Sequence, residues 1–361
     1  MAIDTMDKLS ELDDKSSLQS EQFIPQQIDH NENHIISVYD QLRPKNEGSF
    51  MSAVREWEKK AGFKTPIVWF NTVAITLFHV LVLVSAYQIF IDGRYYPKWQ
   101  TFLFLFLLAA FTGFGVTGGA HRLWSHRAYK AKLPLQIILL IGFLTAGMND
   151  LYQWVRDHRV HHKFSESSAD PHDANRGFFF AHVGWLMTKK HPDVLREGLK
   201  VDMSDIQNNP LIRFHLKYFQ ISKLVFAFVL PLVIPIVFWD ERISVAFFAL
   251  MLKYTLILHT NWSVNSFAHL YGGRPYDSKI MPRENWMVAL STIGEGWHNY
   301  HHTFPWDYKA AEIPYTFPLN ATANLLDLFA KIGWAYELRV ASPAMIKRVA
   351  ESKGDSTYKE L

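Results

Sequence analysis

The chain has 361 residues, and its 37 Lys and Arg against 34 Asp and Glu leave a formal net charge of +3. It contains 17 histidines and 27 phenylalanines but no cysteine. Without cysteine there can be no disulfide, thiolate nucleophile, Fe–S cluster or cysteine-bound zinc, so any metal must be held by histidine or carboxylate.

The first 60 residues are polar, with an acidic cluster around Glu11, Asp13 and Asp14. They contain no apolar core of the kind that a secretory signal peptide needs. A segment of this composition buries too little apolar surface to offset the entropy of folding. We therefore expect residues 1–60 to be a largely disordered tail.

Four apolar stretches follow in two closely spaced pairs. Each stretch of the first pair reaches the roughly 20 residues that a helix needs to cross hydrocarbon. The stretches of the second pair are shorter and can cross only if flanking residues extend the helix. Lys253 lies in the last stretch and is expected to face the bundle interior or to snorkel. The predicted membrane spans are residues 66–91, 101–120, 221–239 and 243–262.

The loops within the two pairs hold only Arg94, Lys98 and Arg242 of the 37 basic residues. By the positive-inside rule, the long polar segments and both termini are cytosolic. The sequence thus predicts an all-α integral membrane protein, with four transmembrane helices in two hairpins under a cytosolic cap. The expected parts are a membrane domain at 61–350, whose cap is 121–220 and 263–350, and a C-terminal tail at 351–361.

The histidines suggest a metal site, because nine of them fall into four tight groups. In two groups the spacing i, i+3, i+4 puts three imidazoles on one face of a helix. Neutral imidazole suits Fe, Zn, Cu or Ni, and nine such ligands exceed what one ion accepts. Two metal ions are therefore predicted, with the ligands His121, His126, His158, His161, His162, His269, His298, His301 and His302.

The first pair, His121 and His126, is five residues apart, which is about 140° on a regular helix. The two fit better where a helix ends, or as ligands of two different ions. The remaining eight histidines are interpreted as ordinary polar residues. They are His30, His34, His79, His172, His182, His191, His215 and His259.

A fifth apolar stretch, from Leu133 to Met148, has only 16 residues and could cross the bilayer or lie in its interface. If it crossed, His121 and His126 would lie on the opposite side from His158, and a shared site would be impossible. The metal hypothesis therefore requires this stretch to lie in the interface.

Several strings resemble the membrane fatty acid desaturases, specifically the acyl-CoA desaturases of the stearoyl-CoA type. They lie at 119–124, 149–158, 170–172, 177–185, 274–277 and 294–298, and the strings at 302–309 and 330–336 resemble the insect branch most. The resemblance covers about residues 60–350. It implies insertion of a double bond, most simply of the Δ9 type, into a saturated fatty acyl-CoA.

The resemblance also implies cofactors and partners. These are two iron ions cycling between Fe2+ and Fe3+, O2, and two electrons from cytochrome b5 and its NADH-dependent reductase, in the endoplasmic reticulum membrane. No nucleic-acid partner is expected. With no cysteine, flavin motif or fused haem module in the chain, electrons must come from outside.

Residue roles follow from the same resemblance. The di-iron centre is itself the catalytic group, and Asn265 completes one iron's shell through a water. Positions matching those that bind CoA are Asn149, Arg156, Asp157, Lys189 and Lys190. Positions matching the acyl tunnel are Trp154, Trp262, Asn261, Gly113 and Ala109. Lys189 stands where relatives often carry Arg, which exchanges a forked guanidinium for a point charge at the CoA-binding position. Asn261 and Met148 stand where relatives often carry Thr and Gln, which leaves the position and geometry of the double bond open.

Gly113 also begins a G-x-G-x-x-G match with Gly115 and Gly118. It lies inside a membrane span, follows no strand and precedes no suitably spaced acidic residue, so a dinucleotide site is rejected. The small residues there, with Ala109 and Ala110, are expected to thin the helix against a neighbour or an acyl chain.

Other readings of the histidines are weaker. A hydroxylase or alkane-oxidising relative would share their spacing but not the acyl-CoA-type strings. A carboxylate-bridged di-iron bundle needs repeated Glu-x-x-His, and only Glu295 and His298 provide it. A zinc hydrolase would need an obvious general base beside a His-x-x-x-His pair, and the sequence offers no such base. A haem protein or transporter would need ligands at mid-membrane depth, where only His79 and His259 qualify.

Overall fold

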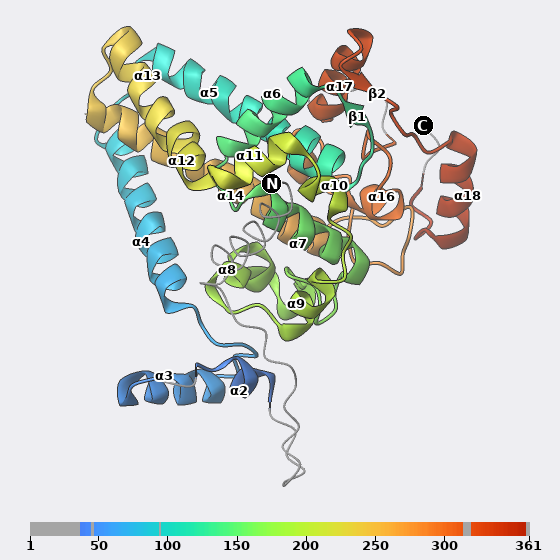
Figure 1. Ribbon diagram of the computed structural model, residues 1–361, viewed down its shortest axis with the longest axis horizontal. Coiled ribbons are helices and arrows are strands. Elements are labelled where there is room, and N and C mark those ends of the chain that lie inside the picture. Colours follow the sequence, from blue (N-terminus) through green and yellow to red (C-terminus); the bar gives the residue numbers. More distant parts are fainter. Residues whose placement is uncertain (1–36, 45–46, 94, 313–318, 359–361) are drawn as a thin grey trace, which may run out of the picture. The chain divides into compact units, whose positions relative to one another are not determined.

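The computed structural model describes residues 37–44, 47–93, 95–312 and 319–358 (Figure 1). The chain divides into two compact units, Met1–Pro66 and Ile67–Leu361. Each unit is described by itself.

The described residues of the first unit form two helices, α2 (Val38–Leu42) and α3 (Ser49–Lys60). The Tyr39 hydroxyl donates a 2.6 Å hydrogen bond to Glu58, which also pairs with Arg55 at 2.9 Å. These buried contacts hold α3 against α2, so the expectation of a disordered tail is wrong for these two helices. Residues 1–36 of that expected tail lie outside the described residues.

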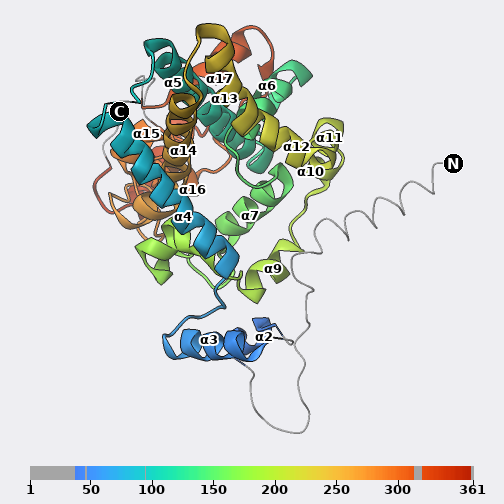
Figure 2. The ribbon, with the colours of Figure 1, turned by 90° about the vertical axis from the view of Figure 1, so that its left-hand side faces the viewer.

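Among the described residues of the second unit, four helices are long and apolar enough to cross a membrane, which confirms the predicted fold class. They are α4 with η1 (Trp69–Ile91), α5 with η2 (Trp99–Ser125), α12 with η5 and α13 (Phe219–Trp239), and α14 (Ile243–Leu270). The second and fourth helices extend beyond the predicted ends at 120 and 262. Both continue as helix into the histidine-bearing region. Figure 2 shows α4 and α14 beside each other, in agreement with their contacts.

Helix α6 (Leu133–Leu144) follows the second span and has 12 residues, about 18 Å at 1.5 Å per residue. That is too short to cross hydrocarbon, as the metal hypothesis requires. It packs closely on η2, where a Cβ at Gly115 would lie 2.2 Å from the backbone nitrogen of Phe143. Gly115, one of the small residues of the rejected dinucleotide motif, therefore permits a close helix crossing at this point.

Lys253 faces the bundle interior, one of the two expected alternatives. Its Nζ donates to Thr112 Oγ1 and to the carbonyl oxygen of Thr145, both at 3.1 Å. Thr145 is the C-terminal cap of α6. The cation thus meets the carbonyl end of a helix, where the helix dipole favours positive charge.

The cap is built from short helices around this stem. Before the third span lie α7 (Leu151–Phe164), η3 (Ala174–Arg176), η4 (Phe180–Gly184), α8 (Trp185–Met187), α9 (Pro192–Gly198), α10 (Ser204–Gln207) and α11 (Pro210–Lys217). After the fourth lie α15 (Trp286–Ser291), α16 (His298–Thr303), α17 (Ala321–Lys331) and α18 (Pro343–Lys353). Two short strands, β1 (Lys130–Ala131) and β2 (Ala335–Tyr336), pair antiparallel.

The end of the chain packs on the cap, contrary to the expected tail at 351–361. The backbone nitrogen of Arg274 donates to Asp355 at 2.6 Å, and the hydroxyl of Tyr358 donates to Glu312 at 2.9 Å. Tyr358 also meets the ring of Tyr276. These contacts were missed because their partners lie far away in the sequence, while residues 359–361 lie outside the described part.

Candidate metal centre

The nine predicted ligands gather in two clusters, and within each cluster the ligand atoms lie within 4.8 Å of one another. The first cluster consists of His121, His126, His158, His162 and His301. The second consists of His161, His269, His298 and His302. Helices α7 and α16 each contribute to both clusters, so each His-x-x-His-His triplet is shared between the two sites.

His121 and His126 lie in the same cluster, which excludes the alternative that they serve two different ions. His121 lies within η2 (Gly115–Ser125), which is a π-helix, and His126 caps the end of this helix. The amide of His126 donates to the carbonyl of His121 at 3.1 Å. Bonding from i+5 to i brings residues five apart onto one face. The ring centroids are consequently only 4.8 Å apart.

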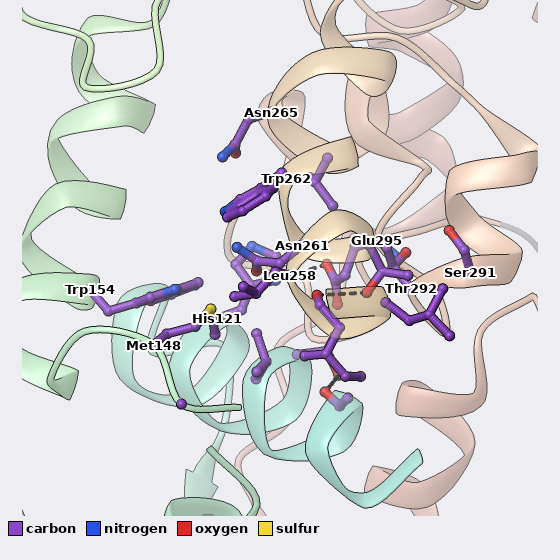
Figure 3. A pocket seen from close by; sticks show the side chains of 18 of the residues that line it. His121, Met148, Trp154, Leu258, Asn261, Trp262, Asn265, Ser291, Thr292 and Glu295 are labelled. Atoms are coloured by element: carbon purple, nitrogen blue, oxygen red, sulfur yellow. Dashed lines mark hydrogen bonds and ion pairs between the residues drawn. The ribbon is translucent and has the colours of Figure 1, made fainter. Parts of the chain in front are cut away.

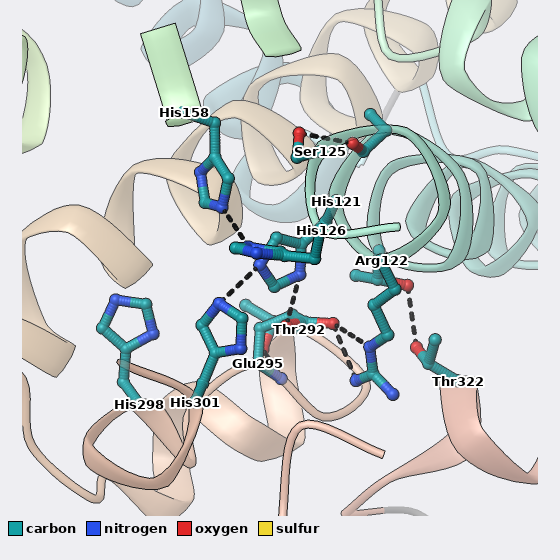
Figure 4. Close-up of polar contacts among 12 residues, drawn as sticks. His121, Arg122, Ser125, His126, His158, Thr292, Glu295, His298, His301 and Thr322 are labelled. Carbon is teal, nitrogen blue, oxygen red and sulfur yellow. Dashed lines mark hydrogen bonds and ion pairs between the residues drawn. The ribbon is translucent and has the colours of Figure 1, made fainter. Parts of the chain in front are cut away.

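Three carboxylates contact Nδ1 of clustered histidines, on the side of each ring that faces away from the cluster. Glu295 Oε2 lies 2.8 Å from Nδ1 of His121, while its Oε1 pairs with Arg122 (Figure 4). In the second cluster, Asp170 and Glu166 lie 2.8 Å and 2.7 Å from Nδ1 of His161 and His269. Outer carboxylates of this kind fix the tautomer and ring orientation of ligating histidines.

The sequence patterns do not reveal these three roles. Glu295 lies in the resembling string at 294–298 and three residues before His298, but in the structure it contacts His121. Asp170 lies in the string at 170–172 that resembles the desaturases, but the resemblance assigns no role to this residue. No local pattern links Glu166 to His269, 103 residues away.

The side chains present fit metal ions. Nδ1 of His161 and Nδ1 of His269 each hydrogen-bond a carboxylate. Because a carboxylate only accepts hydrogen bonds, these two nitrogens carry the proton and the Nε2 atoms present lone pairs. Nε2 of His121 faces Nε2 of His301 at 2.9 Å, and Nε2 of His269 faces that of His298 at 3.0 Å. Nε2 of His161 is buried without a hydrogen-bond partner among the described residues. Converging buried lone pairs are suited to a cation.

The electrostatics favour neutral imidazoles, which are the form that binds metals. Burial, together with repulsion from neighbouring rings, holds the pKa well below its usual value at His126, His158, His162, His298, His301 and His302. His161 differs, because Asp170 raises its pKa in spite of burial. Burial opposes ionisation of Glu295, yet Arg122 and His121 lower the pKa of that carboxyl to about 2.

A cavity of about 1140 Å³ adjoins both clusters. Its wall includes His121 and His158 of the first cluster and His161 and His298 of the second. Figure 3 shows Trp154, Asn261, Trp262 and Asn265 around it. The five residues expected at an acyl tunnel all line this cavity, together with Asn265 and Met148.

The expected CoA-binding residues divide between the cavity wall and its surroundings. Asn149 and Asp157 line the cavity. Lys190 donates to Asp157 Oδ2 at 2.5 Å, and Arg156 lies 3.4 Å from Oδ1. Burial opposes ionisation of Asp157, but Lys190 and Arg156 hold its pKa below the usual range. Lys189 is partly buried beside Lys190 in the sequence.

Three histidines interpreted as ordinary polar residues form a chain beside the cavity. His79 Nε2 lies 3.2 Å from His259 Nε2, and His259 Nδ1 lies 2.9 Å from His182 Nε2. The two nitrogens of His259 point to different partners, so the rings do not converge on one ion. All three rings pack around Trp262. His172, from the same group of ordinary residues, joins His161 and Asp170 in a third possible metal-binding group and lines the cavity.

Fold and site together define a membrane protein with two all-histidine clusters that could hold metal ions beside a cavity. Residues 97–338 match the fatty acid desaturase family, and the chain belongs to that family. This confirms the resemblance seen in the motifs.

Three relatives cover most of the chain. The acyl-CoA Delta-9 desaturase of Acheta domesticus is 45% identical over 315 residues, covering 87% of this chain and 86% of that protein. The acyl-CoA Delta(11) desaturase of Spodoptera littoralis is 49% identical over 294 residues, covering 81% and 86%. The stearoyl-CoA desaturase of Homo sapiens is 42% identical over 321 residues, covering 89% and 88%.

Proposed function

We propose that the protein is an oxygen-dependent acyl-CoA desaturase that introduces a double bond into a saturated fatty acyl-CoA. The observation that carries this proposal is the cavity whose wall includes two histidines from each cluster. A chain lying in it would pass both metal positions. The names of the insect and human relatives support acyl-CoA as the substrate class.

The nine clustered histidines would hold two iron ions, with Asn265 completing one shell through a water. Bound iron would supply the activation of O2 that the removal of unactivated hydrogens requires. Trp154 stacks on His158 with ring centroids 5.1 Å apart, so it would fix that ligand and close the cavity wall. The cavity would exclude water and set which methylene lies beside the clusters.

The CoA end would be held by Asn149, Arg156, Asp157, Lys189 and Lys190. Asp157 draws Lys190 and Arg156 to the cavity wall, where their charges suit phosphate groups. The acyl chain would then run past Trp154, Trp262 and Asn261 to Gly113 and Ala109. The proposed double-bond position is Δ9, as in the name of the cricket relative, and Δ11 of the moth relative is the alternative.

Electrons would come from cytochrome b5 and its NADH-dependent reductase, because the chain offers no carrier of its own. We place the protein in the endoplasmic reticulum membrane with both termini cytosolic. Support for this orientation comes from the scarcity of Lys and Arg in the loops between paired spans.

The test is expression in yeast lacking its own desaturase, with double bonds in the total fatty acids mapped by mass spectrometry. A new double bond is expected, and its position separates Δ9 from Δ11. His161→Ala and His301→Ala each remove one ligand from one cluster and should abolish the product. His191→Asn, outside both clusters, is the matched control. Hydroxylated chains, or full activity in the ligand variants, would contradict the proposal.

A further inference from the structure

Helix α3 carries an apolar stripe that remains uncovered. Phe50, Val54 and Trp57 fall within about 60° of one another on a helix of 3.6 residues per turn. The side chains of Phe50 and Trp57 are 77% and 55% exposed. On the other side of the helix, Glu56 and Lys59 are exposed polar residues. The helix is therefore amphipathic, with its apolar side facing outward.

Buried ion pairs fix the rotation of this helix. Arg55 pairs with Glu58 at 2.9 Å and with Glu47 at 3.0 Å, and Tyr39 of α2 donates to Glu58 at 2.6 Å. Glu58 is fully buried. Rotating α3 to hide the stripe would keep the Arg55–Glu58 pair, which lies on the helix itself, but would separate Arg55 from Glu47 and Glu58 from Tyr39. A buried charge that loses a partner is costly. The stripe is thus held outward by the contacts on its other side.

Chain connectivity keeps α3 near a bilayer. The helix ends at Lys60 and the first membrane span begins at Trp69, so the residues between them can extend over at most about 28 Å. Lys59, Lys60 and Lys64 lie at this end of α3 and in the connection. Tryptophan favours the membrane–water interface, and lysines beside it are attracted to anionic headgroups.

We propose that α3 lies in the bilayer interface, with Phe50, Val54 and Trp57 inserted among the lipid chains. The partner of this surface is the lipid bilayer itself. The length of an interfacial helix does not matter as long as one face is apolar and the other polar. The inference stands apart from the proposed catalysis, because it involves neither the clusters nor the cavity.

The absence of cysteine makes a direct test possible. Single cysteines replace Phe50, Val54 or Trp57 on the stripe, and Glu56 or Lys59 as matched controls on the opposite side. Each full-length variant is labelled with a nitroxide and reconstituted in vesicles of phosphatidylcholine with phosphatidylserine. Collision rates with O2, which concentrates in the bilayer, and with a water-soluble nickel chelate are then measured by electron paramagnetic resonance.

The ratio of O2 to nickel collisions should be several-fold higher at 50, 54 and 57 than at 56 and 59. Nickel access at the stripe equal to that at the controls would show that the stripe lies in water. Protection from both reagents would show that protein covers it. Either result overturns the proposal. Substituting an exposed side chain should leave the fold intact, which the desaturase activity of each variant checks independently.

Discussion

Glu295 contacts His121 on the side of the ring that faces away from the cluster, with one carboxylate oxygen 2.8 Å from Nδ1. The other oxygen accepts from Arg122, which is itself 1% exposed and also donates to the backbone carbonyls of Tyr308 and Lys309. A ligand on η2 is thereby tied to the segment that precedes α16.

Replacing Glu295 with Gln should lower metal occupancy. The amide can still accept from Arg122, but its NH2 group would replace the charged oxygen that lies 2.8 Å from Nδ1 of His121. Losing such an outer partner weakens metal binding by about 10- to 100-fold. The measurement is the iron content of purified protein by elemental analysis at fixed free iron. Glu337→Gln, which removes an exposed pair with Lys130, is the control and should bind iron normally.

Replacing Gly113 with Phe should shorten the preferred acyl chain. A Cβ at this position would lie 3.2 Å from Cδ1 of Ile293, and both residues line the cavity. A benzyl group there would fill space that the chain end needs. Product chain lengths in yeast fatty acids check this. Leu103→Phe on the exposed side of the same helix should change nothing, and an unchanged length preference at Gly113→Phe would refute the tunnel assignment.

Replacing Lys253 with Met should destabilise the stem. The thioether fills a similar volume but cannot donate to Thr112 or to the carbonyl of Thr145 at the end of α6. An unsatisfied buried acceptor costs about 1–3 kcal/mol. Thermal unfolding in detergent should show a lower midpoint for Lys253→Met than for Lys253→Arg, which keeps donors. Equal midpoints would mean that the cation does not anchor α6.

Acid should weaken the attachment of α10 to α7 through Asp205. This carboxylate pairs with Arg127 at 2.8 Å and with Arg159 at 2.7 Å. Burial opposes its ionisation, but the two guanidinium groups lower its pKa to about 2. Because the folded pKa lies below the unfolded value near 3.9, the stabilisation is complete above about pH 5 and declines as pH falls towards 2.

The comparison with Asp205→Asn isolates this effect. The variant should unfold at a lower temperature than the parent protein at pH 7, and the difference should shrink as the pH falls below about 4. Thermal unfolding across this range measures it. A difference that stays constant with pH would contradict the assigned pairing.

The spans and the clustering of the histidines were predictable because their signals are local. Hydrophobic length marks a membrane helix, and the spacing around His158 and His298 is contained within one helical turn. The contacts from Glu166 to His269 and from Glu295 to His121 were not predictable, because tertiary packing alone brings these pairs together. The π-helix at His121 was equally hidden, since no local sequence pattern separates it from an α-helix, although Gly115 on the same element packs closely on α6.

Because α7 and α16 each carry histidines of both clusters, the two clusters cannot be ordered independently. An ion bound in either cluster would fix the rotation and position of both helices, and would so align the imidazoles of the other cluster. Part of the entropy cost of assembling the second site is then already met when its ion arrives. Loading should consequently be cooperative, so that partly supplied protein would separate into empty and doubly filled molecules, with few that hold a single ion.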